Sequence, residues 1–346
     1  MSKTIIFLFV IVGLLFLGTM WFFLGSPKSI FYKDNLCGDG SLENTCSAMK
    51  PYFCYNEILS ENAIVCGCDE TRSVSGNFCV SELQTEPKEV NLKYILRGKE
   101  YEINYIVYSG LAEYLSELPV YINYDGNSTP SRTDFKLKNI DETAQKEFLL
   151  PLVVEIQNRA HDKEEQARVA ISIVQNLDWG FSNKTTIYRE TELPYSRHPY
   201  EVLYDMQGVC GEKSELMAFL LREIGYGVVI FYNQEENHES VGIKCPVEES
   251  WNNSGYCFIE TTGPSIITDT SINYVGGLDL KSEPEILFIS DGDSLDIDMY
   301  EYGDAEKLAD IKESINGDSF FFNPWKFVQF KNLEKKYGLA KEYNAG

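Results

Sequence analysis

The chain has 346 residues, of which 44% are hydrophobic, and a formal net charge of −23 from 30 Lys and Arg against 53 Asp and Glu. This length and apolar content predict at least one sizeable core and roughly two or three domains. The acidic charge argues against a nucleic-acid partner, because a phosphate backbone requires a basic surface.

The N-terminus begins with a long apolar segment. Residues 4–24 read TIIFLFVIVGLLFLGTMWFFL and contain no charged residue. About 20 apolar residues are enough to cross a bilayer as a helix. A signal peptide is the alternative, although its apolar region usually has only about 7–15 residues. We therefore predict a transmembrane anchor over residues 1–28, and a single-pass membrane protein that contacts the membrane through 4–24.

Eight of the nine cysteines fall into close groups. A dense, even set of cysteines after an export segment predicts disulfides and a body outside the cytoplasm. The region 29–82 needs them, because its apolar content is too low for a core. Zinc is the alternative interpretation, but no CxxC pair occurs and no histidine lies nearby. The predicted disulfide cysteines are Cys37, Cys46, Cys54, Cys66, Cys68, Cys79, Cys245 and Cys257.

The spacing of the first six cysteines resembles that of an epidermal-growth-factor-like (EGF-like) module. The pair Cys66-Gly-Cys68 and the late Gly76-Asn-Phe-Cys79 belong to this resemblance. It implies that the first cysteine pairs with the third, the second with the fourth and the fifth with the sixth. The implied disulfides are Cys37–Cys54, Cys46–Cys66 and Cys68–Cys79.

A β-rich accessory region is predicted over 83–140. Residues 90–110 alternate in hydrophobicity and are rich in Ile, Val and Tyr, and the turn at 97–99 indicates a hairpin. A short helix over 110–118 and a loop over 123–131 follow.

The predicted core spans 141–290 and begins with helical patterns. Pro151 predicts that the first helix is kinked or starts afresh at that residue. The second helix, over 162–177, has an Asp162 cap and one apolar stripe.

Cys210 is the cysteine without a neighbour in sequence. Apolar residues at helical spacing follow it, and Gly225 ends their pattern, so Cys210 lies at or just before a helix N-terminus. Helix N-termini present unpaired amide hydrogens and a partial positive charge, which favour a nucleophilic thiolate. The same amides can receive a developing oxyanion. A buried small side chain or a disulfide partner is the alternative, but the odd cysteine count favours a nucleophile.

Three predicted strands follow this helix, over 226–234, 238–245 and 256–264. His238 heads the second strand and Glu260 lies inside the third. A cysteine at a helix N-terminus, followed by a histidine and a carboxylate on adjacent strands, has the order of nucleophile, base and orienting group.

Side-chain parity tests whether the last two residues can meet. Side chains alternate between the faces of a strand, so if Cys245 and Cys257 share a face, His238 and Glu260 share the opposite one. A register with the cysteines directly opposed places His238 across from Pro264. We favour the register that pairs His238 with Glu260, with the two cysteines bridged across the base of a loop.

With these residues, 141–264 resembles the transglutaminase-like superfamily, which has a papain-like cysteine-hydrolase core. The family typically has G-x-C before a helix ending in L-R-x-x-G, then a His, then D-x-T-x-P. This chain has GVCGEKSELMAFLLREIGY, a histidine on a strand, and ETTGP. Glu260 stands where the family usually has Asp, and Gly211 stands where many true transglutaminases have Trp.

The resemblance implies an α+β fold with a papain/transglutaminase-like core, in which a catalytic helix packs on an antiparallel sheet. We expect a transmembrane helix and the disulfide-rich module before it. It also implies Cys210, His238 and Glu260 as catalytic residues, with Gln207 and Trp179 as candidate oxyanion donors.

The implied enzyme is a cysteine hydrolase or acyltransferase without metal or cofactor, and we favour hydrolysis. Its expected substrate is a protein or peptide amide, including a surface or cell-wall polymer. The alternative function is a non-catalytic surface module for binding or adhesion.

The remaining segment, 291–346, is predicted to be an acidic loop followed by a helical segment. Its aspartates suggest calcium, but they lack the glycine and the final acid of an EF-hand loop.

Overall fold

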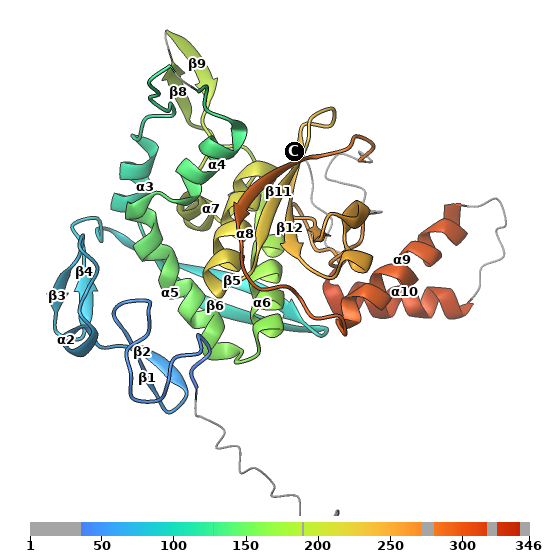
Figure 1. Cartoon of the computed structure of the whole chain (residues 1–346), viewed down its shortest axis with the longest axis horizontal. Helices are drawn as coiled ribbons and strands as arrows, with labels where there is room; N and C mark the ends of the chain where they lie inside the picture. Colours follow the sequence, from blue (N-terminus) through green and yellow to red (C-terminus); the bar gives the residue numbers. More distant parts are fainter. Residues whose placement is uncertain (1–35, 127, 189, 271–279, 317–323, 340–346) are drawn as a thin grey trace, which may run out of the picture.

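A four-stranded antiparallel sheet forms the centre of the computed structural model (Figure 1), which describes residues 36–126, 128–188, 190–270, 280–316 and 324–339. The strand order is β13–β12–β11–β14. Both faces of β11 are covered, because Val228 and Ile230 join the main core while Val229 and Phe231 join a second apolar cluster. This explains its uninterrupted apolar sequence. The strands are β11 (Val228–Asn233), β12 (His238–Lys244), β13 (Tyr256–Ile259) and β14 (Glu285–Ser290).

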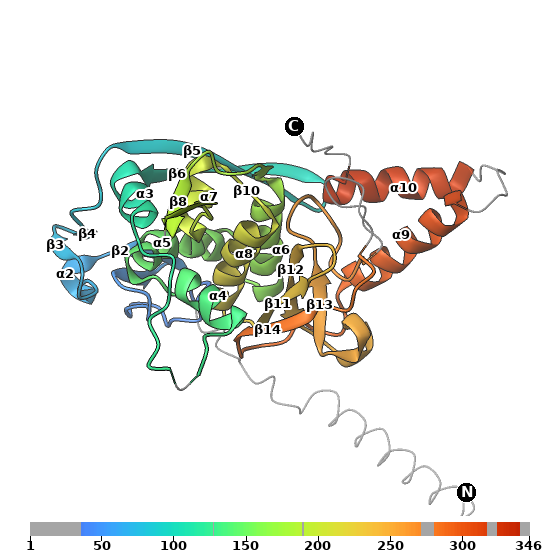
Figure 2. The same cartoon turned by 90° about the horizontal axis from the view of Figure 1, so that it is seen from above.

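Three helices form a layer between this sheet and a long hairpin of β5 (Pro87–Leu96) and β6 (Lys99–Tyr108) (Figure 2). The predicted cap of the second helix is confirmed, since the Asp162 Oδ1 accepts the Glu165 N–H at 3.0 Å. The predicted end of the third is also confirmed at Gly225, whose φ of 113° suits a residue without Cβ. The helices are α5 (Thr143–Arg159), α6 (Lys163–Asn176) and α8 (Cys210–Ile224).

Helix α5 runs through Pro151 as one helix, so the prediction of a fresh start there is wrong. Proline removes one backbone hydrogen bond from a helix. Apolar side chains on both sides of it are buried, among them Leu149, Leu152 and Val153. Because packing supplies most helix stability in proteins, this burial holds the helix together.

The predicted hairpin of the accessory region is confirmed. Strands β5 (Pro87–Leu96) and β6 (Lys99–Tyr108) pair along their whole length. Arg97 and Gly98 join them with φ of 51° and 76°, and two residues with positive φ match the twist of a tight hairpin.

The same region also contains two helices, α3 (Ser109–Ser116) and α4 (Arg132–Ile140). The second was not predicted, because Ile140 is its one buried residue and its sequence has no apolar stripe. Ser131 and Asp134 cap it reciprocally, and Lys136 fixes it to α8 by an ion pair with Glu215 at 2.8 Å.

The cysteine-rich module, residues 36–82, is made of short elements joined by disulfides. The bonds are Cys37–Cys54, Cys46–Cys66 and Cys68–Cys79, the pairs that the resemblance implies. Its elements are β1 (Tyr52–Tyr55), β2 (Ile58–Glu61), α2 (Ala63–Cys66), β3 (Ser73–Ser75) and β4 (Phe78–Val80).

The module packs against α5. Asn158 of this helix accepts the Leu59 N–H at 2.8 Å and donates to the Leu59 carbonyl at 2.9 Å. Val154 of the same helix lies in the module's own apolar cluster. Figures 1 and 2 show the module at one end of the molecule, and α9 (Tyr300–Asn316) and α10 (Pro324–Tyr337) at the other.

The C-terminal segment contains a loop and two packed helices. Arg168 of α6 binds Glu301 through two hydrogen bonds, of 2.6 and 3.0 Å, and so attaches α9 to the core. The remaining elements include the hairpin of β8 and β9, which projects from the body (Figure 1). Their bounds are β7 (Asp178–Trp179), β8 (Thr185–Tyr188), β9 (Thr191–Pro194), α7 (Pro199–Asp205), β10 (Gln207–Gly208), η1 (Val247–Glu249), η2 (Trp251–Asn253), α9 (Tyr300–Asn316) and α10 (Pro324–Tyr337).

The predicted fold class is corrected in one respect. The chain mixes helices and sheet, but the parts that the structure describes contain no helix long and apolar enough to cross a membrane. The longest of these helices have 17 residues and carry charges, whereas a span needs about 20 apolar ones. This finding contradicts the prediction of a single-pass membrane protein with its body outside the cytoplasm. The predicted segment 4–24 itself lies outside the described residues.

Candidate active site

Cys210 is the first residue of α8, at the helix N-terminus predicted for it. Eight cysteines form four disulfides, including Cys245–Cys257, which leaves Cys210 free and half-buried. The Glu212 carboxylate reaches back to accept the Val209 N–H at 3.1 Å, as an acid at this helix position does in a capping box. Cys210, the candidate nucleophile, is therefore the first residue of a capped helix. The first backbone N–H groups of this helix point outward from its N-terminal end.

His238 lies between Cys210 and Glu260. It heads β12, as predicted, and its Nε2 lies 2.9 Å from Oε2 of Glu260. Burial lowers the pKa of His238, but hydrogen bonds with Cys210 and Glu260 and their negative charges outweigh burial and raise that pKa to about 10. Because Nε2 is used by Glu260, Nδ1 is left for the thiol. The site therefore favours an imidazolium at neutral pH, with partners on both of its nitrogens.

Glu260 is buried and fixed at both oxygens. Its Oε1 accepts the Thr262 N–H at 2.7 Å and the Thr262 hydroxyl at 2.6 Å. Its backbone carbonyl accepts from Gln175 of α6 at 2.9 Å. With only 1% of the residue exposed, the carboxylate has one orientation, in which Oε2 faces the His238 ring.

The strand positions differ from the prediction in two details. Strand β13 ends at Ile259, so Glu260 follows the strand instead of lying inside it. The register pairs Ile243 with Cys257, midway between the two registers considered from the sequence. Continued further, it places His238 opposite Thr262, two residues from Glu260. The parity argument holds, but His238 and Glu260 meet diagonally, since the longer Glu side chain spans the offset.

A second set of contacts joins helix α8 to the segment after Glu260. The Thr261 hydroxyl donates to the Cys210 carbonyl at 3.4 Å and lies 3.2 Å from the Ser214 hydroxyl. Lys213, which is fully buried, donates to the Leu177 carbonyl at 2.9 Å and to that of Thr262 at 3.4 Å. The first turns of α8 are thus joined to the segment that follows Glu260.

The two candidate oxyanion donors lie on neighbouring strands. β10 pairs in parallel with β7, which places Gln207 beside Asp178 and Gly208 beside Trp179. This two-strand ladder leads directly into Cys210. Both side chains are half-buried, and the indole packs edge-on against Phe181 at 5.0 Å. The structure thus brings both candidates next to the turn that carries the thiol.

A charged cluster borders the site beside Gly211. Lys136 of α4 lies 2.8 Å from Glu215 and 2.6 Å from Glu239, the residue after His238. Burial opposes the charge on Lys136, but the two glutamates outweigh burial and raise its pKa. A side chain at Gly211 would lie 2.8 Å from Glu239. The Trp that many true transglutaminases carry here would therefore require this cluster to move.

Sequence reasoning did not identify the residues that hold the candidate triad, which are Thr262, Thr261, Gln175, Ser214 and Lys213. Thr262 had a signal, because it is the second threonine of the ETTGP motif. Lys213 and Ser214 belong to the α8 sequence, where their spacing alone indicates only a helix. Across the described ranges, no group of three His, Cys, Asp or Glu residues is placed to hold a metal ion.

No family model matches this chain, and no curated protein matches it significantly. Among solved structures, it is similar to Legionella pneumophila LapG, with a TM-score of 0.27 and 13% identity over 59% of this chain and 99% of that chain. The calcium-bound LapG gives 0.26 and 15%, covering 51% of this chain and 98% of that chain.

The EGTA-treated form of LapG gives a TM-score of 0.26 and 13% identity, covering 59% of this chain and 100% of that chain. None of these comparisons supports an EGF-like module. Similarity at these scores is too low to decide fold or function.

Proposed function

We propose that this chain is a cysteine enzyme that cleaves amide bonds in proteins or peptides. Cys210 is the nucleophile, His238 the general base and acid, and Glu260 the orienting carboxylate. One observation carries the proposal: the buried His238 ring contacts a free thiol on one side and a fixed carboxylate on the other. A histidine with only a structural role needs neither a free cysteine nor a helix N-terminus beside it.

The reaction begins when the Cys210 thiolate attacks the carbonyl carbon of the amide. The carbonyl π electrons move to oxygen, and the oxyanion is stabilised by the Cys210 N–H at the start of α8, with Gln207 and Trp179 as further candidate donors. When the C–N bond breaks, the His238 imidazolium gives its proton to the leaving nitrogen, and a thioester on Cys210 remains. His238 then takes a proton from water, whose oxygen attacks the thioester carbonyl. The C–S bond breaks, the carboxylic acid is released, and Cys210 leaves as the thiolate beside the His238 imidazolium.

We favour hydrolysis over transfer to an amine. Water is always present, and the charged cluster beside Gly211 contains Lys136 already paired with Glu215 and Glu239. Both glutamates of this cluster are therefore occupied by Lys136 and do not present a free carboxylate to an amine substrate. Transfer remains the second outcome of the same thioester.

The direct test replaces Cys210 with Ala and measures two quantities, hydrolysis of a mixed peptide library and the thioester trapped with hydroxylamine. We expect the variant to lose both, by on the order of 1,000-fold or more. Met217→Leu in the middle of the same helix is the control, since a volume-conserving swap should leave both unchanged. A Cys210→Ala protein that cleaves peptides as well as the wild type contradicts the assignment. A folded wild type that forms no thioester with any peptide, isopeptide or glutamine–amine pair supports a binding module instead.

A further inference from the structure

Arg197 is buried beside the candidate site, and the proposed reaction gives it no role. It follows β9 and is 2% exposed. A guanidinium is always charged and offers five donors, so full burial requires several fixed acceptors.

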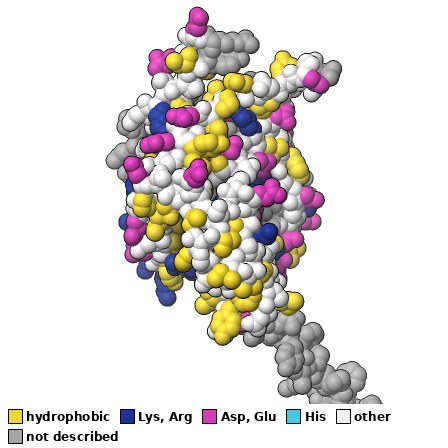
Figure 3. Space-filling model, turned by 90° about the vertical axis from the view of Figure 1, so that its left-hand side faces the viewer, with side chains coloured by type: hydrophobic (Ala, Val, Ile, Leu, Met, Phe, Trp, Pro, Cys, Tyr) yellow, Lys and Arg dark blue, Asp and Glu magenta, His cyan; other side chains and the backbone are white. Residues whose placement is uncertain are grey.

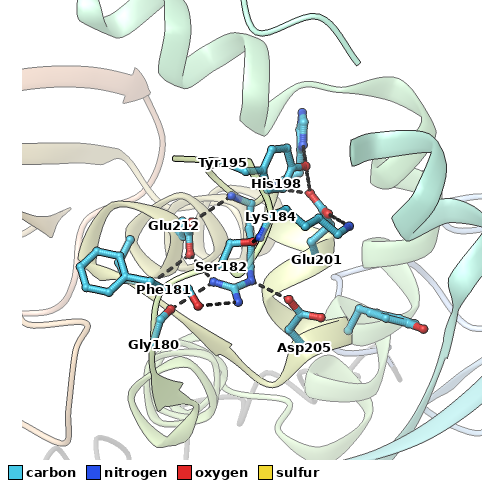
Figure 4. Close-up of polar contacts among 12 residues, drawn as sticks. Gly180, Phe181, Ser182, Lys184, Tyr195, His198, Glu201, Asp205 and Glu212 are labelled. Atoms are coloured by element: carbon cyan, nitrogen blue, oxygen red, sulfur yellow. Dashed lines mark hydrogen bonds and ion pairs between the residues drawn. The ribbon is translucent and has the colours of Figure 1, made fainter. Parts of the chain in front are cut away.

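The acceptors of Arg197 come from three separate segments. Nε donates to Asp205 at the end of α7 at 2.6 Å. Nη1 donates at 3.1 Å both to Glu212 of α8 and to the Gly180 carbonyl, and Nη2 donates to the Phe181 carbonyl at 3.3 Å. Figure 4 shows these four acceptors converging from their different elements. The backbone N–H of Arg197 also donates to the Glu212 carboxylate, at 2.9 Å.

One of these segments carries the nucleophile. The Oε2 of Glu212 accepts from Arg197 and also accepts the Val209 N–H, one residue before Cys210. Burial raises the pKa of Glu212, and Arg197 counteracts that rise with its charge and hydrogen bonds. The guanidinium therefore helps to keep the capping carboxylate charged and oriented.

The second segment carries a candidate oxyanion donor. Gly180 and Phe181 directly follow Trp179, and their carbonyls are held by the same guanidinium. Arg197 thus links the strand of Trp179 to the cap of α8. Lysine could replace the charge of Arg197, but not the planar fork that reaches these acceptors together.

We propose that Arg197 is a positioning residue, which fixes the turn before Cys210 and the strand of Trp179 relative to each other. This inference rests on the proposed function, because it assigns Arg197 a role in the reactivity of Cys210. Without the planar guanidinium of Arg197, the N-terminus of α8 shifts, and the Cys210 thiol loses its alignment with the His238 ring.

The test is Arg197→Lys, with the rate of Cys210 alkylation by iodoacetamide measured from pH 5 to 10 on the full chain. We expect alkylation near neutral pH to slow by about 100-fold, as small misplacements of reacting groups do. We also expect the midpoint of the pH–rate profile to move to higher pH, because the thiolate loses its imidazolium partner. Peptide hydrolysis should fall at least as far.

The matched control is Arg168→Lys. Arg168 also makes a two-bond contact with a buried glutamate, Glu301, but it attaches α9 and touches no residue of the site. Both variants should lower the melting temperature, and only Arg197→Lys should change the pH profile. If Arg197→Lys does not fold, Asp205→Asn replaces it. This change weakens one contact at a half-exposed carboxylate, and a smaller slowing in the same direction is expected.

Two results separate the failure of this inference from that of the proposed function. If wild-type Cys210 reacts quickly and Arg197→Lys, or its substitute, has the same rate and pH profile, Arg197 is merely structural and the inference is overturned. If wild-type Cys210 reacts no faster than the thiol of an unstructured peptide, the proposed function itself fails and the inference fails with it.

Discussion

Glu260 shows how one residue can depart from a family pattern and keep its geometry. Its side chain is one methylene longer than Asp, and the strand register leaves it two residues from the position opposite His238. The hydroxyl and N–H of Thr262 hold Oε1, so the extra length carries Oε2 to within 2.9 Å of the ring. The longer acid therefore fits this register better than an aspartate would.

Replacing Glu260 with Gln tests its charge. Glu260 and Cys210 together raise the pKa of His238 to about 10, so the imidazolium is present from neutral pH up to that value and is lost as the pH rises through it. Gln removes one of these charges, while burial still lowers the pKa. We expect the alkaline limit of hydrolysis to move well below pH 10, and the rate at pH 7 to fall by on the order of 100-fold or more.

Glu260→Asp is the companion variant, since it keeps the charge and shortens the reach. It should retain a high alkaline limit with a lower rate, because the carboxylate cannot contact Thr262 and His238 together. An alkaline limit near pH 10 in the Gln variant would show that Glu260 does not act on His238. Measurement of kcat/KM from pH 5 to 11 distinguishes these results.

The residues of the candidate triad could be chosen from sequence, whereas those that support it could not. An odd cysteine count, the helix N-terminus and side-chain parity point to Cys210, His238 and Glu260. Arg197 has no such signal, because its acceptors come from segments brought together only by the fold. Thr262 has a local signal, but its role depends on a strand that ends one residue before Glu260.

At the scale of elements, the sequence predicts correctly those turns and helix ends that depend on neighbouring residues alone. The hairpin turn at 97–98 and the ends of α6 and α8 follow from backbone conformation and capping. Helix α4 and the continuous α5 depend on ion pairs and packing with distant residues, so the sequence pattern missed both. The register of β12 and β13 is likewise set by packing, and parity alone leaves it open.

The disulfide between Cys245 and Cys257 stabilises the strand pair that carries His238 and leads to Glu260. It closes a loop with a sequence separation of 12. Replacing both cysteines with Ser should lower the free energy of unfolding by about 2–4 kcal/mol. It should also slow Cys210 alkylation, because the two strands can shift relative to each other.

The matched control removes the bond between Cys68 and Cys79, whose sequence separation of 11 is almost the same but which lies in the module. That variant should be destabilised without a change in the alkylation rate. Urea unfolding and alkylation, measured on both double variants, test this expectation. Equal alkylation rates in both would mean that the strand pair keeps the site in place without its disulfide.

At the scale of the whole molecule, the cysteine-rich module is attached to the body by specific contacts. Figure 3 views the molecule from the side on which Figure 1 shows the module, and this face mixes acidic and basic side chains with scattered hydrophobic ones. The sequence predicts the module as a separate unit, because its cysteines are dense and its apolar content is low. Its attachment to α5 could not be predicted, since it depends on Asn158 and Val154 of a helix far along the chain.

Asn158→Ala should loosen this attachment. Asn158 makes two hydrogen bonds to the backbone of Leu59, and their loss leaves a backbone N–H and carbonyl that must find water. We expect the free energy of unfolding to fall by about 1–3 kcal/mol, and protease cleavage in the polar segment 81–86 to become faster.

Asn91→Ala is the control, because Asn91 also makes two hydrogen bonds, but to exposed side chains within one hairpin. Both variants should leave Cys210 alkylation unchanged, since neither residue contacts the site. If Asn158→Ala is cleaved no faster than the control, the apolar contact through Val154 suffices to hold the module. If Asn158→Ala instead slows Cys210 alkylation, a displacement of the module changes the position of α8 through α5.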